Sequence, residues 1–266
     1  MNNYFDYLTG AIPQILNSFG PVFESMGQGM LGGIDIALIL WVGFRVFFGG
    51  MSGSKVMTVL VLIVVTSTLM TYYSTPLPVL GVSFRSLPTS QAAAMTAMIS
   101  SAQNDDLQQA FTAIEGKLEA PSWYDVLGVF VFVILQIVLI VARALTLFAV
   151  SYGFLASATL GIFGPFFIPF LLVPGMDWMF WGWVKSYIQY AFYPVVASAY
   201  TLLGGRMIVA FCQAQNVGSA DVKLSQIFVP LLVVLVVYCY GILKLPSLVS
   251  SMFGGRSGEG AGPGMR

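Results

Sequence analysis

Four charged side chains lie inside long apolar runs, and each needs a physical reason to be there. They are Asp35, Arg45, Arg143 and Lys185. A charge at the centre of a membrane-spanning helix costs about 2.5–3.5 kcal/mol on the insertion scale. Such side chains therefore either reach the headgroup layer, or face a water-filled lumen or a contact between helices or subunits. Both alternatives stay open for these four positions.

The rest of the composition excludes most enzyme chemistry. The chain has no histidine, which removes His-containing catalytic triads and HExxH zinc sites. Its two cysteines, Cys212 and Cys239, form no CxxC unit, and no Gly-rich phosphate loop precedes a Lys-Ser/Thr pair. The 11 basic residues balance the 11 acidic ones, which gives no sign of a polybasic surface for nucleic acid. We expect no enzyme activity, no cofactor and no metal site.

The elements that carry the four charged residues are predicted to be membrane helices. Hydrophobic residues make up 58% of the chain and charged residues only 8%, and the mean hydropathy is +0.86. A membrane-spanning helix needs about 20 mostly apolar residues. Six stretches approach that length: residues 31–48, 56–73, 126–150, 152–173, 178–203 and 227–243.

Glycines and prolines predict where these helices end. Paired glycines predict breaks at 49–53, 204–205 and 254–255, and Pro13 and Pro21 predict two short helices near the start of the chain. The fourth stretch contains the run GPFFIPFLLVP, which cannot hydrogen-bond its backbone as a regular helix. Residues 161–177 are therefore the candidate for a broken or re-entrant segment, which a membrane tolerates only where protein or water shields it.

The polar stretch between the two apolar blocks, residues 74–125, is predicted to be a helical hairpin outside the membrane. Thr89 is the expected N-cap of a helix that runs to Ala102. Asn104 is expected to cap a second helix, which Pro121 ends. Both helices are amphipathic, so we expect them to pack against another surface.

The distribution of charge predicts how the chain is oriented. Arg45 and Lys55 flank the short turn at 49–55, which favours the cytoplasm, and the acidic stretch 74–125 suits the outer side. The N-terminus would then be periplasmic and the basic C-terminal tail cytoplasmic. That arrangement needs an odd number of crossings, whereas six stretches are candidates.

Two adjoining runs carry a resemblance to a known family. The sequence WGWVKSYIQYAFYPVV at 181–196, preceded by GPFFIPFLLVP at 164–174, resembles the TrbL-type polytopic inner-membrane subunit of type IV secretion systems. The resemblance extends to IDIALILWVGFR at 34–45 and to LPSLVSSMFGG at 245–255. The positions that match the motif of the family are Gly164, Pro165, Trp183 and Pro194.

The resemblance implies a channel component of a conjugation machine. Such a subunit forms a homo-oligomeric ring in the bacterial inner membrane at the base of the secretion stalk. It contacts the DNA or protein substrate and binds periplasmic stalk and scaffold subunits, while separate secretion ATPases supply the energy. The four charged residues would then line a lumen or assembly contacts, within a protein surrounded by membrane lipids.

Taken together, the sequence predicts an all-α, polytopic membrane protein. It has five or six transmembrane helices, one of them a candidate for a broken or re-entrant segment, and a helical extramembrane loop. The predicted organisation is an amphipathic segment (1–30), a first transmembrane hairpin (31–73), the periplasmic loop (74–125), a second transmembrane block (126–245) and a Gly-rich tail (246–266).

Two other classes of function remain as alternatives. A small-solute secondary transporter would explain broken helices near membrane charges. Against this alternative, the two halves of the chain show no internal repeat. A phage or toxin protein that lyses membranes is the third class. Solute uptake would distinguish the transporter from a secretion component, and lysis on expression would distinguish the lysis protein.

Overall fold

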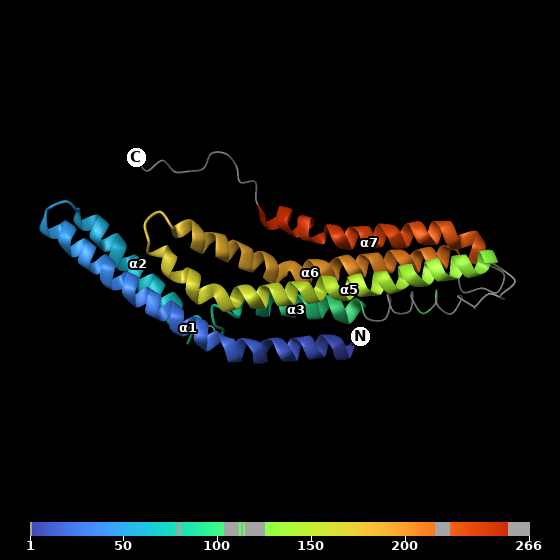
Figure 1. Cartoon of the computed structure of the whole chain (residues 1–266), viewed down its shortest axis with the longest axis horizontal. Coiled ribbons are helices and arrows are strands. Elements are labelled where there is room, and N and C mark those ends of the chain that lie inside the picture. Colours follow the sequence, from blue (N-terminus) through green and yellow to red (C-terminus); the bar gives the residue numbers. More distant parts are fainter. Residues whose placement is uncertain are drawn as a thin grey trace. The chain divides into compact units, whose positions relative to one another are not determined.

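The computed structural model describes residues 2–78, 81–103, 112, 114, 126–215 and 224–254. Every regular element in these ranges is a helix, which confirms the predicted all-α class (Figure 1). The elements are α1 (Asn2–Phe47), α2 (Gly53–Thr71), α3 (Leu87–Gln103), α5 (Val126–Phe167), the 3-10 helix η1 (Ile168–Leu171), α6 (Asp177–Ala214) and α7 (Leu224–Gly254).

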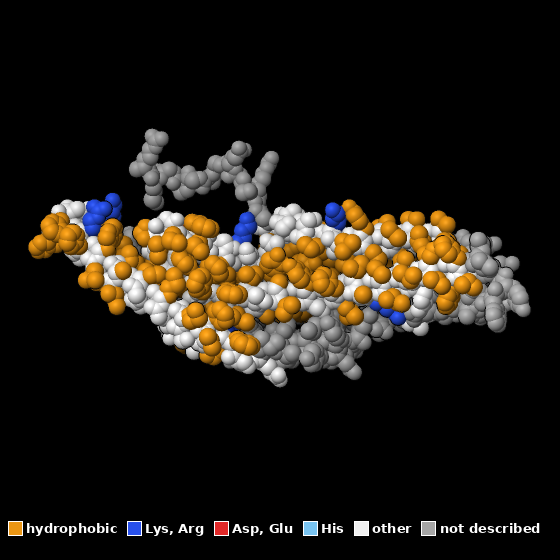
Figure 2. Space-filling view, viewed as in Figure 1, with side chains coloured by type: hydrophobic (Ala, Val, Ile, Leu, Met, Phe, Trp, Pro, Cys, Tyr) orange, Lys and Arg blue, Asp and Glu red, His pale blue; other side chains and the backbone are white. Residues whose placement is uncertain are grey.

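Five of the described helical segments are long and apolar enough to cross a membrane. They are Ser18–Phe47, Gly53–Thr71, Gly128–Leu171, Asp177–Ala214 and Phe228–Phe253. Large apolar side chains are exposed on all five, as the orange side chains on the face in Figure 2 illustrate. The predicted boundary between separate spans at 126–150 and 152–173 is wrong, because α5 continues without a break from Val126 to Phe167. Its backbone breaks only after Phe167, at η1 and the following turn, inside the predicted special region.

The predicted interruptions at Pro13 and Pro21 are also wrong, because both prolines lie within the single helix α1. A proline removes one backbone hydrogen bond and kinks a helix without necessarily ending it. In apolar surroundings no water is present to hydrogen-bond the other backbone N–H and carbonyl groups. Helical hydrogen bonds are then the only ones open to them, so the helix continues past the proline. Pro165, Pro194, Pro230 and Pro246 likewise lie inside helices.

The first of the three glycine breaks is confirmed, because Gly49 adopts a left-handed φ of +69° in the turn between α1 and α2. The predicted break at 254–255 lies at the edge of the described residues and stays a prediction. The predicted break at 204–205 is wrong, because α6 continues to Ala214. Gly204 instead makes room for the ring of Tyr238, which would collide with any Cβ at that position.

The chain divides into two compact units, and α5 and α6 contribute residues to both. The first unit comprises Met1–Gln91 and Gly153–Phe192, and the second Ala92–Tyr152 and Tyr193–Arg266. The core of the first unit is rich in aromatic side chains. Its buried members are Leu31, Met70, Tyr73, Ile168, Leu172, Phe180, Trp183 and Tyr187.

In the second unit, α6 and α7 pack by reciprocal insertion of tyrosines into glycine positions. Tyr238 of α7 lies against Gly204 of α6, and Tyr200 of α6 lies against Gly241 of α7. The two tyrosine rings stack with centroids 6.0 Å apart. The Tyr238 hydroxyl also shares a 2.8 Å hydrogen bond with Thr146 of α5. This interlock fixes the register of α7 on its neighbours.

The helix α3 begins two residues before the predicted cap at Thr89. Ser83 and Ser86 form a reciprocal cap: the Ser86 N–H donates to Ser83 Oγ at 3.2 Å, and the Ser83 N–H donates to Ser86 Oγ at 3.0 Å. Thr89 lies in the first turn, where its hydroxyl donates to the Ser86 carbonyl at 3.1 Å. The second predicted helix of the hairpin falls mostly outside the described residues.

Candidate functional site

In the first unit, one face of α1 carries Glu24 between two glycines, and other elements approach the helix closely at each glycine. Gly20, Glu24 and Gly27 follow one another at helical spacing of four and three residues, so they share a face. A Cβ at Gly20 would lie 2.8 Å from an Arg85 guanidinium nitrogen. A Cβ at Gly27 would collide with the backbone carbonyl of Pro165 on α5. The glycines therefore let other elements approach Glu24 closely.

On α5, Pro165 creates an unpaired backbone acceptor. Proline has no N–H, so the carbonyl four residues earlier, on Gly161, receives no helical hydrogen bond. The hydroxyl of Tyr73 donates to that carbonyl at 2.5 Å. Tyr73 lies just after α2 and is 2% exposed, which leaves no room for water to replace it. A side chain 88 residues away thus satisfies the acceptor that the proline leaves open.

Gly164 and Trp183 complete this contact. A Cβ at Gly164 would overlap the ring of Tyr73, so only glycine admits the tyrosine at this depth. The indole N–H of Trp183, on α6, donates to the Leu160 carbonyl of α5 at 2.9 Å. The Trp183 ring stacks on Tyr187 with an interplanar angle of 9° and centroids 5.6 Å apart.

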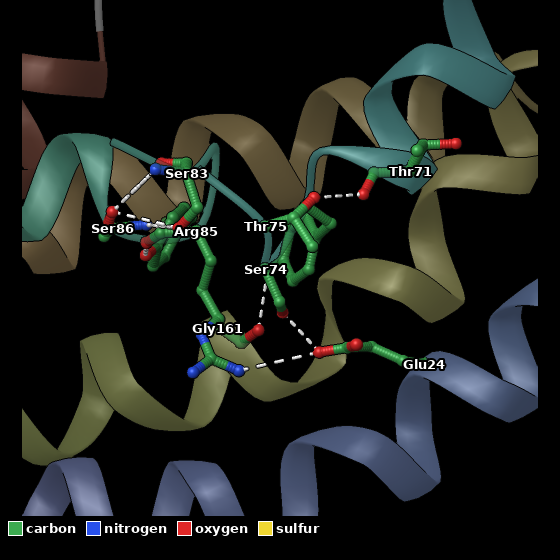
Figure 3. Close-up of polar contacts among 10 residues, drawn as sticks. Glu24, Thr71, Ser74, Thr75, Ser83, Arg85, Ser86 and Gly161 are labelled. Atoms are coloured by element: carbon green, nitrogen blue, oxygen red, sulfur yellow. Dashed lines mark hydrogen bonds and ion pairs between the residues drawn. The ribbon is translucent and has the colours of Figure 1, made fainter. Parts of the chain in front are cut away.

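Arg85 joins the connection between α2 and α3 to α1 and α6 (Figure 3). Its guanidinium lies 3.8 Å from a carboxylate oxygen of Glu24, and the two side chains are 17% and 27% exposed. The Ser74 hydroxyl donates to the same carboxylate oxygen. The Arg85 carbonyl accepts a hydrogen bond from the Tyr187 hydroxyl, and its N–H donates to the Tyr73 carbonyl at 2.9 Å.

Burial raises the pKa of Tyr73 well above its ordinary value, and the nearby Tyr187 and Glu24 add to that effect, while Arg85 opposes it. The phenol therefore stays protonated and able to donate to Gly161. Because the pKa is raised by folding, the stability that this proton contributes is complete below about pH 10 and is lost as the pH rises through the folded-state value.

We name these residues the connector latch: Glu24, Tyr73, Ser74, Arg85, Gly161, Gly164, Pro165, Trp183 and Tyr187. Its interactions join α1, the connection after α2, α5 and α6 within one unit. It holds one ion pair and several hydrogen bonds to backbone carbonyls, and the structure describes no group of three metal-ligating side chains. The arrangement is suited to holding the connection in place on the membrane helices.

The four charged residues predicted from the sequence lie on three helices, α1, α5 and α6. Arg45 is exposed at the end of α1, its guanidinium carbon 5.4 Å from the centre of the Trp41 ring. Lys185 is exposed on α6, and Arg143 is half-buried in the second unit. Asp35 is half-buried on α1, and its Oδ1 atom is buried with no hydrogen-bond partner among the described residues. A lumen or assembly role for these residues stays a prediction.

Three of the four family-motif positions lie in the connector latch. Gly164, Pro165 and Trp183 are all buried there, whereas Pro194 is buried in α6 within the second unit. The residues that these three contact belong to no motif, and the sequence does not mark them as partners. Glu24 and Arg85 carry opposite charges next to apolar runs, which was a usable signal, but nothing in the sequence pairs Tyr73 with Gly161.

Comparison with known families agrees with the family resemblance of the runs at 164–174 and 181–196. Residues 36–243 match the family model described as TrbL/VirB6 plasmid conjugal transfer protein, which covers well over half of the chain. A search of curated proteins found no match. The chain belongs to the TrbL/VirB6 plasmid conjugal transfer family, and it is a multi-pass membrane component of a conjugal transfer, or type IV secretion, system.

Proposed function

We propose that the chain forms the homo-oligomeric, membrane-embedded base of a type IV secretion channel and guides DNA or protein across the bacterial inner membrane. Periplasmic stalk and scaffold subunits would bind this base, and separate ATPases would supply the energy. Family membership supports the secretion role. The observation that carries the oligomeric part is a seam of exposed residues along α1.

The seam repeats every seven residues, at alternating steps of four and three. Its members are Val22, Met26, Gly29, Gly33, Ile36, Leu40 and Gly43, and all are exposed. The three glycines have open space where a Cβ would be. Small residues between large apolar ones let membrane helices approach closely, and a seven-residue repeat is typical of helices that pack side by side. The seam therefore suits another copy of α1.

The experiment is native mass spectrometry of the tagged chain after extraction in mild detergent. We expect a multiple of 28.7 kDa. Gly33→Ile should fill the seam and lower the oligomer mass, whereas Gly32→Ile should not. Gly32 is the matched control, since it is equally open and exposed but lies one residue off the seam. A monomeric wild type, or equal behaviour of the two variants, would contradict the oligomeric role.

A conjugation assay tests the secretion role separately. Deletion of the chain should abolish transfer, and full transfer without it would overturn the proposal. The four charged residues are tested in the same assay by single alanine variants of Asp35, Arg45, Arg143 and Lys185. Loss of transfer with the assembly intact would support a lumen role, and normal transfer in all four would remove it.

A further inference from the structure

The tip of the α1–α2 hairpin is an exposed group of aromatic and basic side chains. Three phenylalanines, Phe44, Phe47 and Phe48, are 67%, 85% and 66% exposed. Their rings contact one another, with centroids 4.5 Å apart for Phe44 and Phe48 and 5.3 Å apart for Phe47 and Phe48. At the left end of Figure 2, where α1 and α2 meet in Figure 1, basic side chains lie beside hydrophobic ones.

The charge close to this tip is entirely positive. Between residues 36 and 71 the only charged residues are Arg45 and Lys55, and both are exposed. The nearest acidic residue along α1, Asp35, is ten residues before Arg45, or about 15 Å along the helix. The tip therefore offers two cations, and the nearest acidic side chain on α1 is too far along the helix to pair with Arg45.

Arg45 is held in place before any ligand arrives. Its guanidinium carbon lies over the Trp41 ring at 5.4 Å from the centroid. One guanidinium nitrogen also lies close to Gly50, 3.4 Å from the position that a Cβ would take there. The Gly50 N–H in turn donates to the Arg45 carbonyl at 2.9 Å. A cation restrained in this way loses less freedom when an anion binds.

The length of α2 places the tip at the level of the lipid headgroups. The helix has 19 residues and is therefore about 28 Å long, close to the roughly 30 Å of hydrocarbon in a bilayer. If one end of α2 meets one membrane surface, the other end meets the opposite one. Tyr72, which is half-buried, follows the far end, and aromatic residues are enriched at both surfaces. The tip then lies where lipid phosphates lie.

We propose that the hairpin tip is a docking surface for anionic lipid headgroups, with Arg45 and Lys55 binding the phosphate and the three phenylalanines inserted among the acyl chains. The complementarity of charge favours an anionic lipid over a neutral one. The aromatic rings account for a lipid occupant better than for a soluble acidic protein, because they are exposed beside Arg45 at the end of α1. This inference does not depend on the oligomeric state of the chain.

The test counts lipids bound to the purified full chain by native mass spectrometry during titration with phosphatidylglycerol or phosphatidylcholine. Each cation near an anionic surface contributes about fivefold to binding, so the wild type should favour phosphatidylglycerol by about tenfold or more. Arg45→Gln together with Lys55→Gln should abolish that preference. Both side chains are exposed, so the double variant should fold normally.

Lys244→Gln is the matched control. The Lys244 ammonium also lies 5.4 Å from an aromatic centroid, that of Tyr240, but it is the only charged residue between 228 and 253. The control should keep the preference for phosphatidylglycerol. An unchanged preference in the double variant would overturn the proposal, as would an equal loss in the control, which would mean that total charge alone is responsible. A wild type that binds both lipids equally would also overturn it.

Discussion

At the scale of the residue, Pro165 and Tyr73 depend on each other. The proline leaves the Gly161 carbonyl without its helical donor, and the tyrosine supplies a replacement at 2.5 Å. Gly164, one residue before the proline, is what allows the ring to come so close. Two residues that look like helix breakers, Gly164 and Pro165, therefore serve one hydrogen bond from Tyr73.

We predict that Tyr73→Phe lowers the free energy of unfolding by about 1–3 kcal/mol, because it leaves a buried carbonyl unsatisfied. In a Pro165→Ala background the same change should cost less, since the alanine N–H can bond the Gly161 carbonyl. Unfolding in detergent, followed by circular dichroism, measures both. Tyr72→Phe is the control, and equal losses at positions 72 and 73, or no difference between backgrounds, would refute the pairing.

The ion pair gives a second prediction at this scale. Arg85→Ala removes the cation beside a Glu24 that is only 27% exposed. Breaking a fully buried pair costs about 3–5 kcal/mol, so at this partial exposure we expect about 2 kcal/mol. Removing Glu24 as well should restore part of the loss, because no unpaired charge is left. Lys55→Ala is an exposed control, and a double variant as unstable as the sum of the single ones would count against the pair.

Three of the nine residues of the connector latch could be predicted from the sequence. Gly164, Pro165 and Trp183 were predicted as motif positions because they match the family that the sequence resembles. Tyr73 and Arg85 were not, since each acts through a contact with residues distant in the sequence. A single sequence shows which carbonyl a proline inside a helix leaves unpaired, but not which distant side chain donates to it.

At the scale of the element, composition predicted the membrane helices well and their ends poorly. Each described span falls within or across a predicted apolar stretch, because apolar length is a local property. The predicted breaks at Pro13, Pro21 and 204–205 failed for a different reason. Proline and glycine lower local helix propensity, but distant partners such as Tyr238 decide whether the helix continues.

The interlock between α6 and α7 yields a prediction for glycine. Gly204→Ala and Gly241→Ala each force a tyrosine ring to move and should cost about 1–3 kcal/mol of stability. Gly182→Ala is in the same helix as Gly204 but has open space around it, so better helix propensity should stabilise the chain by up to about 1 kcal/mol. Thermal unfolding of the three variants compares them. Opposite signs are expected, and a common sign for Gly204 and Gly182 would contradict the interlock.

At the scale of the whole molecule, the long helices constrain how the chain meets the membrane. The 42 residues of α5 make a helix about 63 Å long, roughly twice the hydrocarbon thickness of a bilayer. Such a helix must either tilt steeply or extend beyond the hydrocarbon. Because α5 merges two predicted spans, the described chain has five candidate crossings, the odd number that its charge distribution requires.

We predict that the N-terminus is periplasmic and that both the α1–α2 tip and the C-terminus are cytoplasmic. Single cysteines placed at Ser52 and Asn2, in a variant with Cys212 and Cys239 replaced by serine, can be labelled with an impermeant maleimide in intact and permeabilised cells. Position 2 should react in intact cells and position 52 only after permeabilisation. Labelling of both positions in intact cells would disprove five single crossings in this orientation.

The interlock of tyrosines with glycines also has a consequence for how this chain can change over evolutionary time. Gly204 cannot acquire a side chain while Tyr238 remains, and Gly241 cannot acquire one while Tyr200 remains. Either member of a pair is therefore replaceable only when its partner changes too. Related sequences that keep this packing should show correlated substitution at 204 with 238 and at 241 with 200, while Gly182 varies independently.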